Sequence, residues 1–385
     1  MISAVLHALR MAAIMGWEIL WALIFGFLIS GAIQAVVSHG EMARLLPDDR
    51  PRSILKATFL GAASSSCSYA AVAIGRSIFR KGGNFTAAMA FQFASTNLVV
   101  ELGLILAILL GWRFTAATWA GGLVMIVLLV ILMRLVFRKH LVDQARAQAD
   151  KGLAGRMEGH AAMDMAVTEG PLARRLSSAR GLTAISHYFW MDWASLWFDI
   201  ALGLVIAGAL AAWVPSGLWA RVFDAGDPAA TRIVGPLIGP LIAVVTFVCS
   251  IGNVPLAAVL WNGGASFGGV IAFIFGDLIV LPILDIYRRY YGLKVAALLG
   301  LVFYAAMAGA AWLIEILFGG LHLIPTQRAA RLMPETISWN YTTWLDLIGI
   351  GLSALLLWRF MTTGGPAMLK AMEAPGEHDH ACHNH

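Results

Sequence analysis

The sequence predicts an all-α integral membrane protein, and three observations lead to this fold class. Hydrophobic residues make up 59% of the 385 residues and charged residues only 13%, about half the charged share of soluble domains. Apolar runs of about 20 residues or more, long enough to cross a bilayer, recur along most of the chain. Two further apolar stretches are interrupted near their middles by small polar residues. A chain with so few charges cannot cover a water-soluble surface, so the apolar runs are expected to lie in lipid.

Seven apolar stretches are candidates for helices that cross the membrane completely. The first is too long for the core of a signal peptide and lacks a convincing cleavage site, which favours a retained span. The three cysteines are too few for a disulfide scaffold. The formal charge of +5 is read loop by loop as a topology signal rather than as a sign of nucleic-acid binding. The candidate spans are residues 11–37, 84–110, 114–137, 188–214, 266–287, 295–318 and 343–361.

The two interrupted stretches, residues 54–80 and 234–262, differ from these spans. The first carries Ser64-Ser65-Ser66-Cys67-Ser68, and the second carries Cys249-Ser250-Ile251-Gly252-Asn253-Val254-Pro255. Apolar segments broken at corresponding positions of two halves are the best sequence indication of a transport site. Irregular backbone at membrane depth is tolerated only where it is buried in protein or lines a cavity. The two interruptions are therefore expected to meet near the centre of the membrane.

An internal repeat relates the two halves of the chain. Cys67-Ser68 in the first half recurs as Cys249-Ser250 in the second, and the same offset places Ala90-Phe91-Gln92-Phe93 on Ala272-Phe273-Ile274-Phe275. A similar series precedes each of these motifs: Trp17, Trp21, Gly26, Gly31 and Ala32 in the first half, and Trp193, Trp197, Gly203, Gly208 and Ala209 in the second. The ordered matches indicate a duplicated unit.

The distribution of basic residues predicts how the two repeats are oriented. If both broken segments cross fully, 15 Lys and Arg residues fall inside and 12 outside. If both are re-entrant hairpins and the N-terminus is outside, 21 fall inside and six outside, which the positive-inside rule prefers. Each repeat then has three transmembrane helices and one re-entrant hairpin, and this odd number of crossings inverts the second repeat. The predicted units are a first repeat, a cytoplasmic linker, a second repeat, and an extra transmembrane helix with a cytoplasmic tail, over residues 1–137, 138–186, 187–318 and 319–385.

Polar residues at and after the hairpin tips are the candidate substrate ligands. Hydroxyl and amide groups can replace a substrate's hydration shell, and thiols suit soft metals or metalloids. A buried cysteine can equally serve as a small hydrophobic residue, and this alternative stays open for both tip cysteines. The candidate substrate-binding residues are Ser64, Ser65, Ser66, Cys67, Ser68, Gln92, Ser95, Asn97, Cys249, Ser250 and Asn253.

Asp277 and Glu101 are the candidate proton-coupling acids. A carboxylate at the bilayer centre costs roughly 2.5–3.5 kcal/mol on insertion scales, so such a residue is a functional candidate by default. Asp277 follows Gly276 in an otherwise apolar run, where the first repeat has Ser95. Glu101 can alternatively be a structural partner of a buried donor.

The C-terminal tail combines metal-ligating residue types. It holds four of the ten histidines within its last eight residues, and His, Cys and carboxylate together can bind zinc, copper or nickel. A tail without a physiological metal is the alternative. The candidate ligands are His378, His380, Cys382 and His383.

Residues of both halves resemble a known family of permeases. The stretch that runs from Cys67-Ser68 through Gly82-Gly83 to Ala90-Phe91-Gln92-Phe93-Ala94-Ser95-Thr96-Asn97-Leu98, with Cys249-Ser250-Ile251-Gly252-Asn253-Val254-Pro255-Leu256, is similar to the predicted-permease family that includes organoarsenical efflux permeases. The resemblance covers most of residues 11–318. It implies export of trivalent organoarsenicals or soft metal ions. The family's first hairpin usually has Cys-Ser-Cys followed by a proline, whereas this chain has one cysteine there and no such proline.

The expected function is therefore that of a permease in the inner membrane, working as a secondary transporter by alternating access. No Walker motif is present, so ATP hydrolysis is not expected, and neither an enzymatic activity nor a cofactor is predicted. A transmembrane thiol–disulfide conduit using Cys67 and Cys249, or a passive channel, is the alternative. The expected partners are the lipid bilayer and a small solute or ion, with no nucleic acid, and a homodimer stays open.

Overall fold

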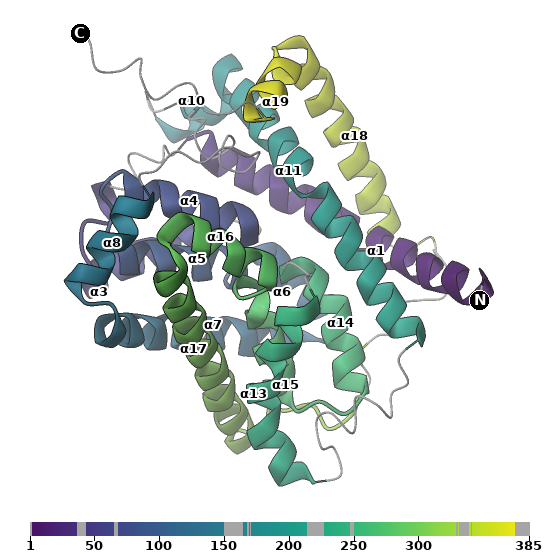
Figure 1. Ribbon diagram of the computed structural model, residues 1–385. Helices are drawn as coiled ribbons and strands as arrows, with labels where there is room; N and C mark the ends of the chain where they lie inside the picture. Colours follow the sequence, from purple (N-terminus) through teal and green to yellow (C-terminus); the bar gives the residue numbers. More distant parts are fainter. Residues whose placement is uncertain are drawn as a thin grey trace.

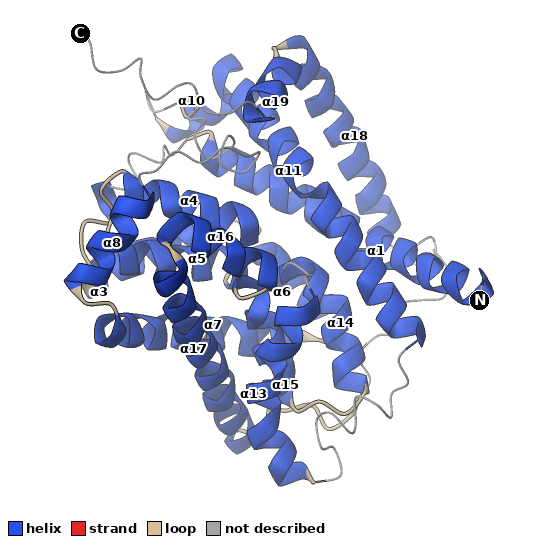
Figure 2. Ribbon diagram, in the orientation of Figure 1, coloured by secondary structure: helices blue, strands red, loops and turns tan. Residues whose placement is uncertain are grey.

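The computed structural model describes residues 2–36, 44–64, 68–149, 165–167, 169, 171–213, 227–246, 250–328, 330, 339 and 341–373. These residues form helices joined by loops and include no strand (Figure 2). The helices before residue 170 are α1 (Ile2–Gln34), α3 (Pro51–Ser64), α4 (Ser68–Arg80), α5 (Phe85–Asn97), α6 (Val100–Leu109), α7 (Trp112–Val136) and α8 (Lys139–Ala149). Those that follow are α10 (Leu172–Ser177), α11 (Ala179–Trp213), α13 (Pro228–Thr246), α14 (Ser250–Asn262), α15 (Phe267–Phe275), the 3₁₀ turn η1 (Gly276–Leu278), α16 (Leu281–Tyr291), α17 (Leu293–Gly320), α18 (Tyr341–Thr362) and α19 (Gly365–Glu373).

Several of these helices are long and apolar enough to cross a membrane. Within the described residues there are four, or five if a pair bent by 41° at residues 279–280 counts as one span. Large apolar side chains point outward from them: Leu135, Leu293 and Trp358 are 70–71% exposed. A soluble protein rarely exposes so much apolar surface, so the chain is a multi-pass membrane protein. The four helices are residues 85–109, 112–136, 293–320 and 342–362.

Each broken stretch folds as two helices, and the chain beyond the second helix returns toward the first. α3 and α4 flank residues 65–67, and the Asn84 N–H beyond α4 donates to the Leu46 carbonyl before α3 at 2.8 Å. α13 and α14 flank residues 247–249, and a Cβ on Gly235 in α13 would lie 3.1 Å from the Ser266 Cβ beyond α14. The first pair therefore returns close to the place where it started, whereas the second returns to a point two turns inside α13.

The same local structure recurs at the offset that aligns Cys67 with Cys249. At this offset the two ends of α4 fall on the two ends of α14, and the start of α5 falls on the start of α15. Asn84 caps the start of α5 by accepting from the N–H three residues on, and Ser266 caps α15 in the same way. Gly82 and Gly264, at the preceding turns, have φ of 99° and 111°, a left-handed conformation that favours glycine.

The first long helices of the two halves pack against each other and run antiparallel. A Cβ on Gly208, near the end of α11, would lie 2.9 Å from the backbone nitrogen of Ala12, near the start of α1. At the opposite end, the Gln34 amide of α1 donates to Asp192 of α11 at 3.3 Å. Figure 1 shows this pair crossing beside α18, and it also packs against the broken stretches, α11 against α14 and α1 against α3.

α7 and α17 occupy matching places in the two halves and are also antiparallel neighbours. A Cβ on Gly121 of α7 would lie 3.0 Å from the Ile314 side chain of α17. Leu128 lies further along α7 but contacts Gly309, which is earlier in α17, so the two helices run in opposite directions. The absence of a side chain at Gly121 and Gly309 lets the two helices come close together.

The segment expected as a linker begins with a packed helix. Ala145 and Ala149 of α8 are fully buried, and α8 lies against α4 and α16. Arg146 donates to two carbonyl oxygens at the end of the first helix pair, those of Phe79 and Gly83. This part of residues 138–186 therefore covers the outer end of the first pair.

Candidate functional site

A buried hydrogen bond joins the first broken stretch to the second half of the chain. Ser68 begins α4, directly after the interruption, and its hydroxyl donates to Asp277 Oδ2 at 2.6 Å. Both residues have no exposed surface. When the carboxyl group is ionised, a hydrogen bond of this kind is charge-assisted and roughly twice as strong as a neutral one.

The local sequence explains why Asp277 lies at a break rather than inside a helix. The apolar helix α15 ends at Phe275, and Pro282 near the start of α16 has no N–H to continue a helical ladder. The chain bends by 41° between the two parts. Gly276 allows η1 to approach α13, because a Cβ there would overlap the Ala243 side chain. Asp277 is thus presented from an irregular turn in the interior.

A second buried contact lies between α5 and α16. The Tyr287 hydroxyl donates to Gln92 Oε1 at 2.9 Å, and both side chains are fully buried. The opposite side of the Gln92 amide faces α4, where a Cβ on Gly75 would overlap its nitrogen and lie 2.8 Å from its Cγ. Gly75 therefore makes the room that this amide occupies.

The three polar residues that end α5 satisfy much of their hydrogen bonding within their own helix. Ser95 Oγ donates to the Gln92 carbonyl at 3.0 Å, and the Thr96 hydroxyl reaches carbonyls of the same turn. The Asn97 amide nitrogen donates to the Phe93 carbonyl and to Thr96. These contacts fit a structural role for Ser95, while the Asn97 amide oxygen stays available as an acceptor.

Buried side-chain amides in this region hold unused hydrogen-bonding capacity. Asn253 in α14 is fully buried, and neither its amide nitrogen nor its oxygen has a hydrogen-bond partner among the described residues. The Gln92 nitrogen and the Asn97 oxygen are likewise without a partner there. Pro255 adds to this, because it offers no N–H to the carbonyl four residues earlier in α14. Buried polar groups are normally hydrogen-bonded, so these groups could serve a polar ligand.

Glu101, the second candidate acid, lies in α6 and takes no part in these hydrogen bonds. It is 4% exposed and sits in the first turn of α6, where the helix dipole favours a negative charge. Within the described ranges, no hydrogen bond or ion pair joins its side chain to another residue. The structure therefore connects Asp277, but not Glu101, to a hairpin residue.

Several predicted site residues fall outside the part of the chain that the structure describes. Ser64 is described, and its hydroxyl donates to the Gly61 carbonyl at 2.9 Å. Among described residues, no group of three or more His, Cys, Asp or Glu could hold a metal ion. Outside the described residues lie Ser65, Ser66, Cys67, Cys249, His378, His380, Cys382 and His383, together with the side chain of Ser250.

Sequence reasoning misses Tyr287. The residue stands at the end of the predicted span 266–287, where the hydropathy pattern makes it part of an apolar run. A periodic pattern is present: Ile283, Tyr287, Tyr290 and Tyr291 form the buried face of α16, at the spacing of an amphipathic helix. That pattern turns Tyr287 inward, but nothing in it identifies Gln92 as the partner.

The fold and the buried polar centre define a class of membrane permease, and comparison with known proteins agrees. Residues 4–316 match the family described as "Predicted permease", and the chain belongs to that family. It is 58% identical over 350 residues to the Mycobacterium tuberculosis protein named "Putative permease Rv2963", an alignment that covers 90% of this chain and 86% of the relative. No solved structure matches the chain.

Proposed function

We propose that this permease is a secondary transporter of the inner membrane that works by alternating access between two inverted repeats. The antiparallel packing of α1 with α11 and of α7 with α17 supports the inversion, because equivalent helices of two inverted units run in opposite directions. The recurrence of helix caps and left-handed glycines at one constant offset supports the repeat itself.

The lengths of the broken helices in the first half support a re-entrant hairpin there. α3 and α4 have 14 and 13 residues, which reach only about 20 Å at 1.5 Å per residue. The hydrocarbon core of a bilayer is about 30 Å thick. The hydrogen bond from Asn84 to Leu46 closes the outer ends together, as expected for a segment that enters and leaves on one side.

The hydrogen bond from Ser68 to Asp277 is the observation that carries the mechanism. It connects a hairpin tip of one repeat with an acid of the other. Protonation of Asp277 would remove the charge that makes this bond strong, and deprotonation would restore it. Binding of a proton to Asp277 would therefore weaken the contact between the hairpin of one repeat and the other repeat. Such a shift between two conformations is the coupling that alternating access needs.

The proposed substrate is a small thiophilic solute, such as a soft metal or metalloid or an organoarsenical, and the proposed direction is export. Cys67 and Cys249 border the two interruptions, and their thiols are soft ligands. The buried amides of Asn253 and Gln92 add donors and acceptors. Ser68 and Asp277 supply the link to protons.

Flux measurements in proteoliposomes test the proposal. Arsenite, methylarsenite, and Ag⁺ would be supplied in turn as substrates, with and without a pH gradient. Uptake by inside-out vesicles should follow the gradient in the wild type and lose that dependence in Asp277→Asn. Asp285→Asn is the matched control, because Asp285 is a surface acid of the adjoining helix α16 that pairs with Arg288 and Arg289. A full gradient response in Asp277→Asn would exclude Asp277 as the coupling acid, and flux that never depends on the gradient would exclude proton coupling.

A further inference from the structure

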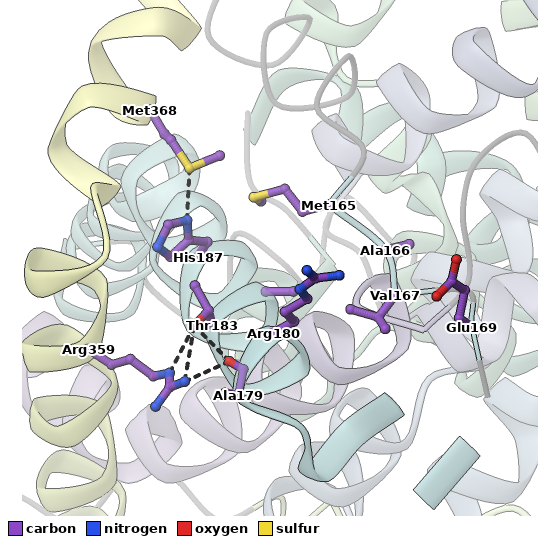
Figure 3. Close-up of a pocket in the computed structure, with 11 residues that line it drawn as sticks. Met165, Ala166, Val167, Glu169, Ala179, Arg180, Thr183, His187, Arg359 and Met368 are labelled. Carbon is purple, nitrogen blue, oxygen red and sulfur yellow. Dashed lines mark hydrogen bonds between the residues drawn. The ribbon is translucent and has the colours of Figure 1, made fainter. Parts of the chain in front are cut away.

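A cavity of about 670 Å³ lies at one end of the helix group formed by α11, α18 and α19 (Figure 3). The first turns of α11 form one wall, the end of α18 and the helix α19 form another, and residues 165–167 and 169 close the remaining side. No described residue of the candidate transport site lines it.

Two guanidinium groups face this cavity. Arg180 is exposed and forms no hydrogen bond or ion pair with another described residue. Arg359 uses Nε and Nη2 to bind Thr183 and the Ala179 carbonyl, at 3.2 and 2.7 Å, and its Nη1 has no hydrogen bond to a described residue. Among the described lining residues, one acid, Glu169, is opposed to these two arginines. The charge of the lining therefore favours an anion.

The one buried histidine of the cavity holds the walls together rather than adding a free charge. His187 is 3% exposed. One ring nitrogen lies 2.7 Å from the Thr363 hydroxyl and the other 2.8 Å from the Met368 sulfur. These contacts, visible in part in Figure 3, fix α11 against the junction of α18 and α19. The arginines are thus displayed on a fixed frame.

Exposed apolar side chains lie close in sequence to the residues of α11 and α18 that line the cavity. Leu182 is 42% exposed, Trp358 is 70% exposed and Met361 is 57% exposed. Trp358 directly precedes Arg359 on α18, and exposed tryptophan is typical of the membrane–water interface. A free inorganic anion would gain nothing from these apolar side chains, whereas an amphiphile would use both the arginines and the apolar surface.

We propose that this cavity binds the phosphate headgroup of an anionic phospholipid, with the acyl chains along α11 and α18. Arginine forms paired, charge-assisted hydrogen bonds with phosphate oxygens. Basic pockets between transmembrane helices on the cytoplasmic side are suited to anionic headgroups. Only 11% of the residues in the most apolar part of α18 are buried in the protein. A lipid that lies along α11 and α18 would therefore cover apolar surface that the protein leaves exposed.

Lipid titration of the purified full-length protein tests this proposal. Phosphatidylglycerol and phosphatidylcholine with identical acyl chains are added to the delipidated protein in detergent, and binding is followed by native mass spectrometry and by the thermal unfolding temperature. Phosphatidylglycerol should bind and raise the unfolding temperature. Arg180→Gln should weaken that binding about tenfold, which is the loss of about one charge-assisted contact. Arg174→Gln, a change at an exposed arginine of α10 that does not line the cavity, should leave it unchanged.

The outcomes separate the possible sources of the phosphate. Equal binding of the two lipids, or unchanged binding by Arg180→Gln, would overturn the proposal. Inorganic phosphate that raises the unfolding temperature as much as phosphatidylglycerol would assign the cavity to a free anion instead. Arg180 is the chosen position because it holds no other described residue, whereas Arg359→Gln would also loosen α11 from α18. None of these readouts measures transport, so the result does not depend on the transport mechanism.

Discussion

Arg146 and Arg328, which the internal repeat aligns with each other, hold the ends of two helices in the same way. The Arg146 guanidinium donates to the carbonyl oxygens of Phe79 and Gly83 at the end of α4. It also stacks over the Phe79 ring, with its carbon 4.0 Å from the ring centroid. Phe79 lies in the last turn of α4, and Gly83 follows that helix by three residues.

The partners of Arg328 are the residues that the repeat aligns with Phe79 and Gly83. Its Nη1 donates to the carbonyl oxygens of Trp261 and Ala265 at 2.8 and 2.9 Å, at the end of α14. Its guanidinium carbon lies 4.7 Å from the Trp261 ring centroid. Each arginine thus satisfies carbonyls that a helix end leaves without donors, and stacks on an aromatic residue. The matching contacts make the two arginines equivalent anchors of the ends of α4 and α14.

Removal of either anchor is expected to destabilise the protein. Arg146→Leu and Arg328→Leu should each lower the free energy of unfolding by about 1.5–3 kcal/mol, because each leaves helix carbonyls without a charged donor. Because the two sites share no partner, the double variant should show nearly additive losses. Thermal unfolding in detergent micelles measures the effect. The exposed Arg52→Gln is the control, and a loss no larger than that of the control would refute the anchor role.

Gly75→Ala should damage the protein through Gln92. A methyl group at this position would overlap the Gln92 amide, so the bond from Tyr287 to Gln92 must shift, and overpacking of this kind costs about 1–3 kcal/mol. Thermal unfolding and flux should both fall. Gly351→Ala makes the same chemical change on α18, where a Cβ meets nothing within 4 Å, and should be neutral or slightly stabilising. Equal behaviour of the two variants would contradict the close packing at Gly75.

Tyr287→Phe removes one oxygen and leaves the ring. The Gln92 Oε1 then loses its donor inside the protein, at a cost of about 1–3 kcal/mol for a buried unsatisfied group. We expect a lower unfolding temperature and reduced flux. Tyr304→Phe is the comparison, because the Tyr304 hydroxyl donates to the Leu237 carbonyl at the exposed surface. If Tyr304→Phe lowers the unfolding temperature as much as Tyr287→Phe does, burial of the Tyr287–Gln92 hydrogen bond does not increase its contribution to stability.

Ser68 and Asp277 should behave as one unit in a double-mutant cycle. Ser68→Ala removes the donor of the 2.6 Å bond and Asp277→Ala removes its acceptor, so the double variant should lose less stability than the sum of the single variants. The coupling expected for residues in direct contact is about 0.5–3 kcal/mol. A Ser68→Ala and Glu101→Gln cycle serves as the reference. Full additivity in the first cycle would show that the bond contributes nothing to folding.

Labelling of single cysteines tests the predicted topology. After Cys67, Cys249 and Cys382 are replaced by serine, a membrane-impermeant thiol reagent is applied to intact cells carrying one cysteine at a time. His7→Cys and His322→Cys should react from outside, and Lys370→Cys should react only after lysis. His7 and Lys370 on one side of the membrane would contradict the inverted arrangement.

Much of the helix pattern could be predicted because local sequence determines it. The apolar run 114–137 matches α7, and the run 295–318 matches α17, within three residues at each end. The small polar cluster at residues 64–68 falls between α3 and α4, as the sequence predicts. Of the cluster at residues 249–255, Ser250 to Pro255 instead form the first turns of α14, so the prediction of an irregular segment there is wrong. The confirmed features depend on neighbouring residues alone.

The pairing of the site residues could not be predicted, because each partner is remote in the chain. The apolar surroundings of Asp277 make it a candidate acid, but its bond to Ser68 spans 209 positions. Glu101 has the same sequence signature, yet it lies in the first turn of a helix. In the sequence Arg146 and Arg328 are only charges between the apolar runs, and nothing in their neighbourhood reveals their partners, although Arg146 lies in the helix α8.

The antiparallel contact of α1 with α11 constrains how the protein is made. α1 is synthesised first, but the helix that accepts the Gln34 hydrogen bond and packs against Ala12 follows only after α3 to α10 have been produced. The first half therefore enters the membrane while one face of its first helix still lacks its partner. If the gene were divided before α11, the two polypeptides would have to find each other in the bilayer, and neither fragment alone would be complete. The packing of α1 against α11 is therefore a late step in the folding of the protein, and it follows the synthesis of the second half.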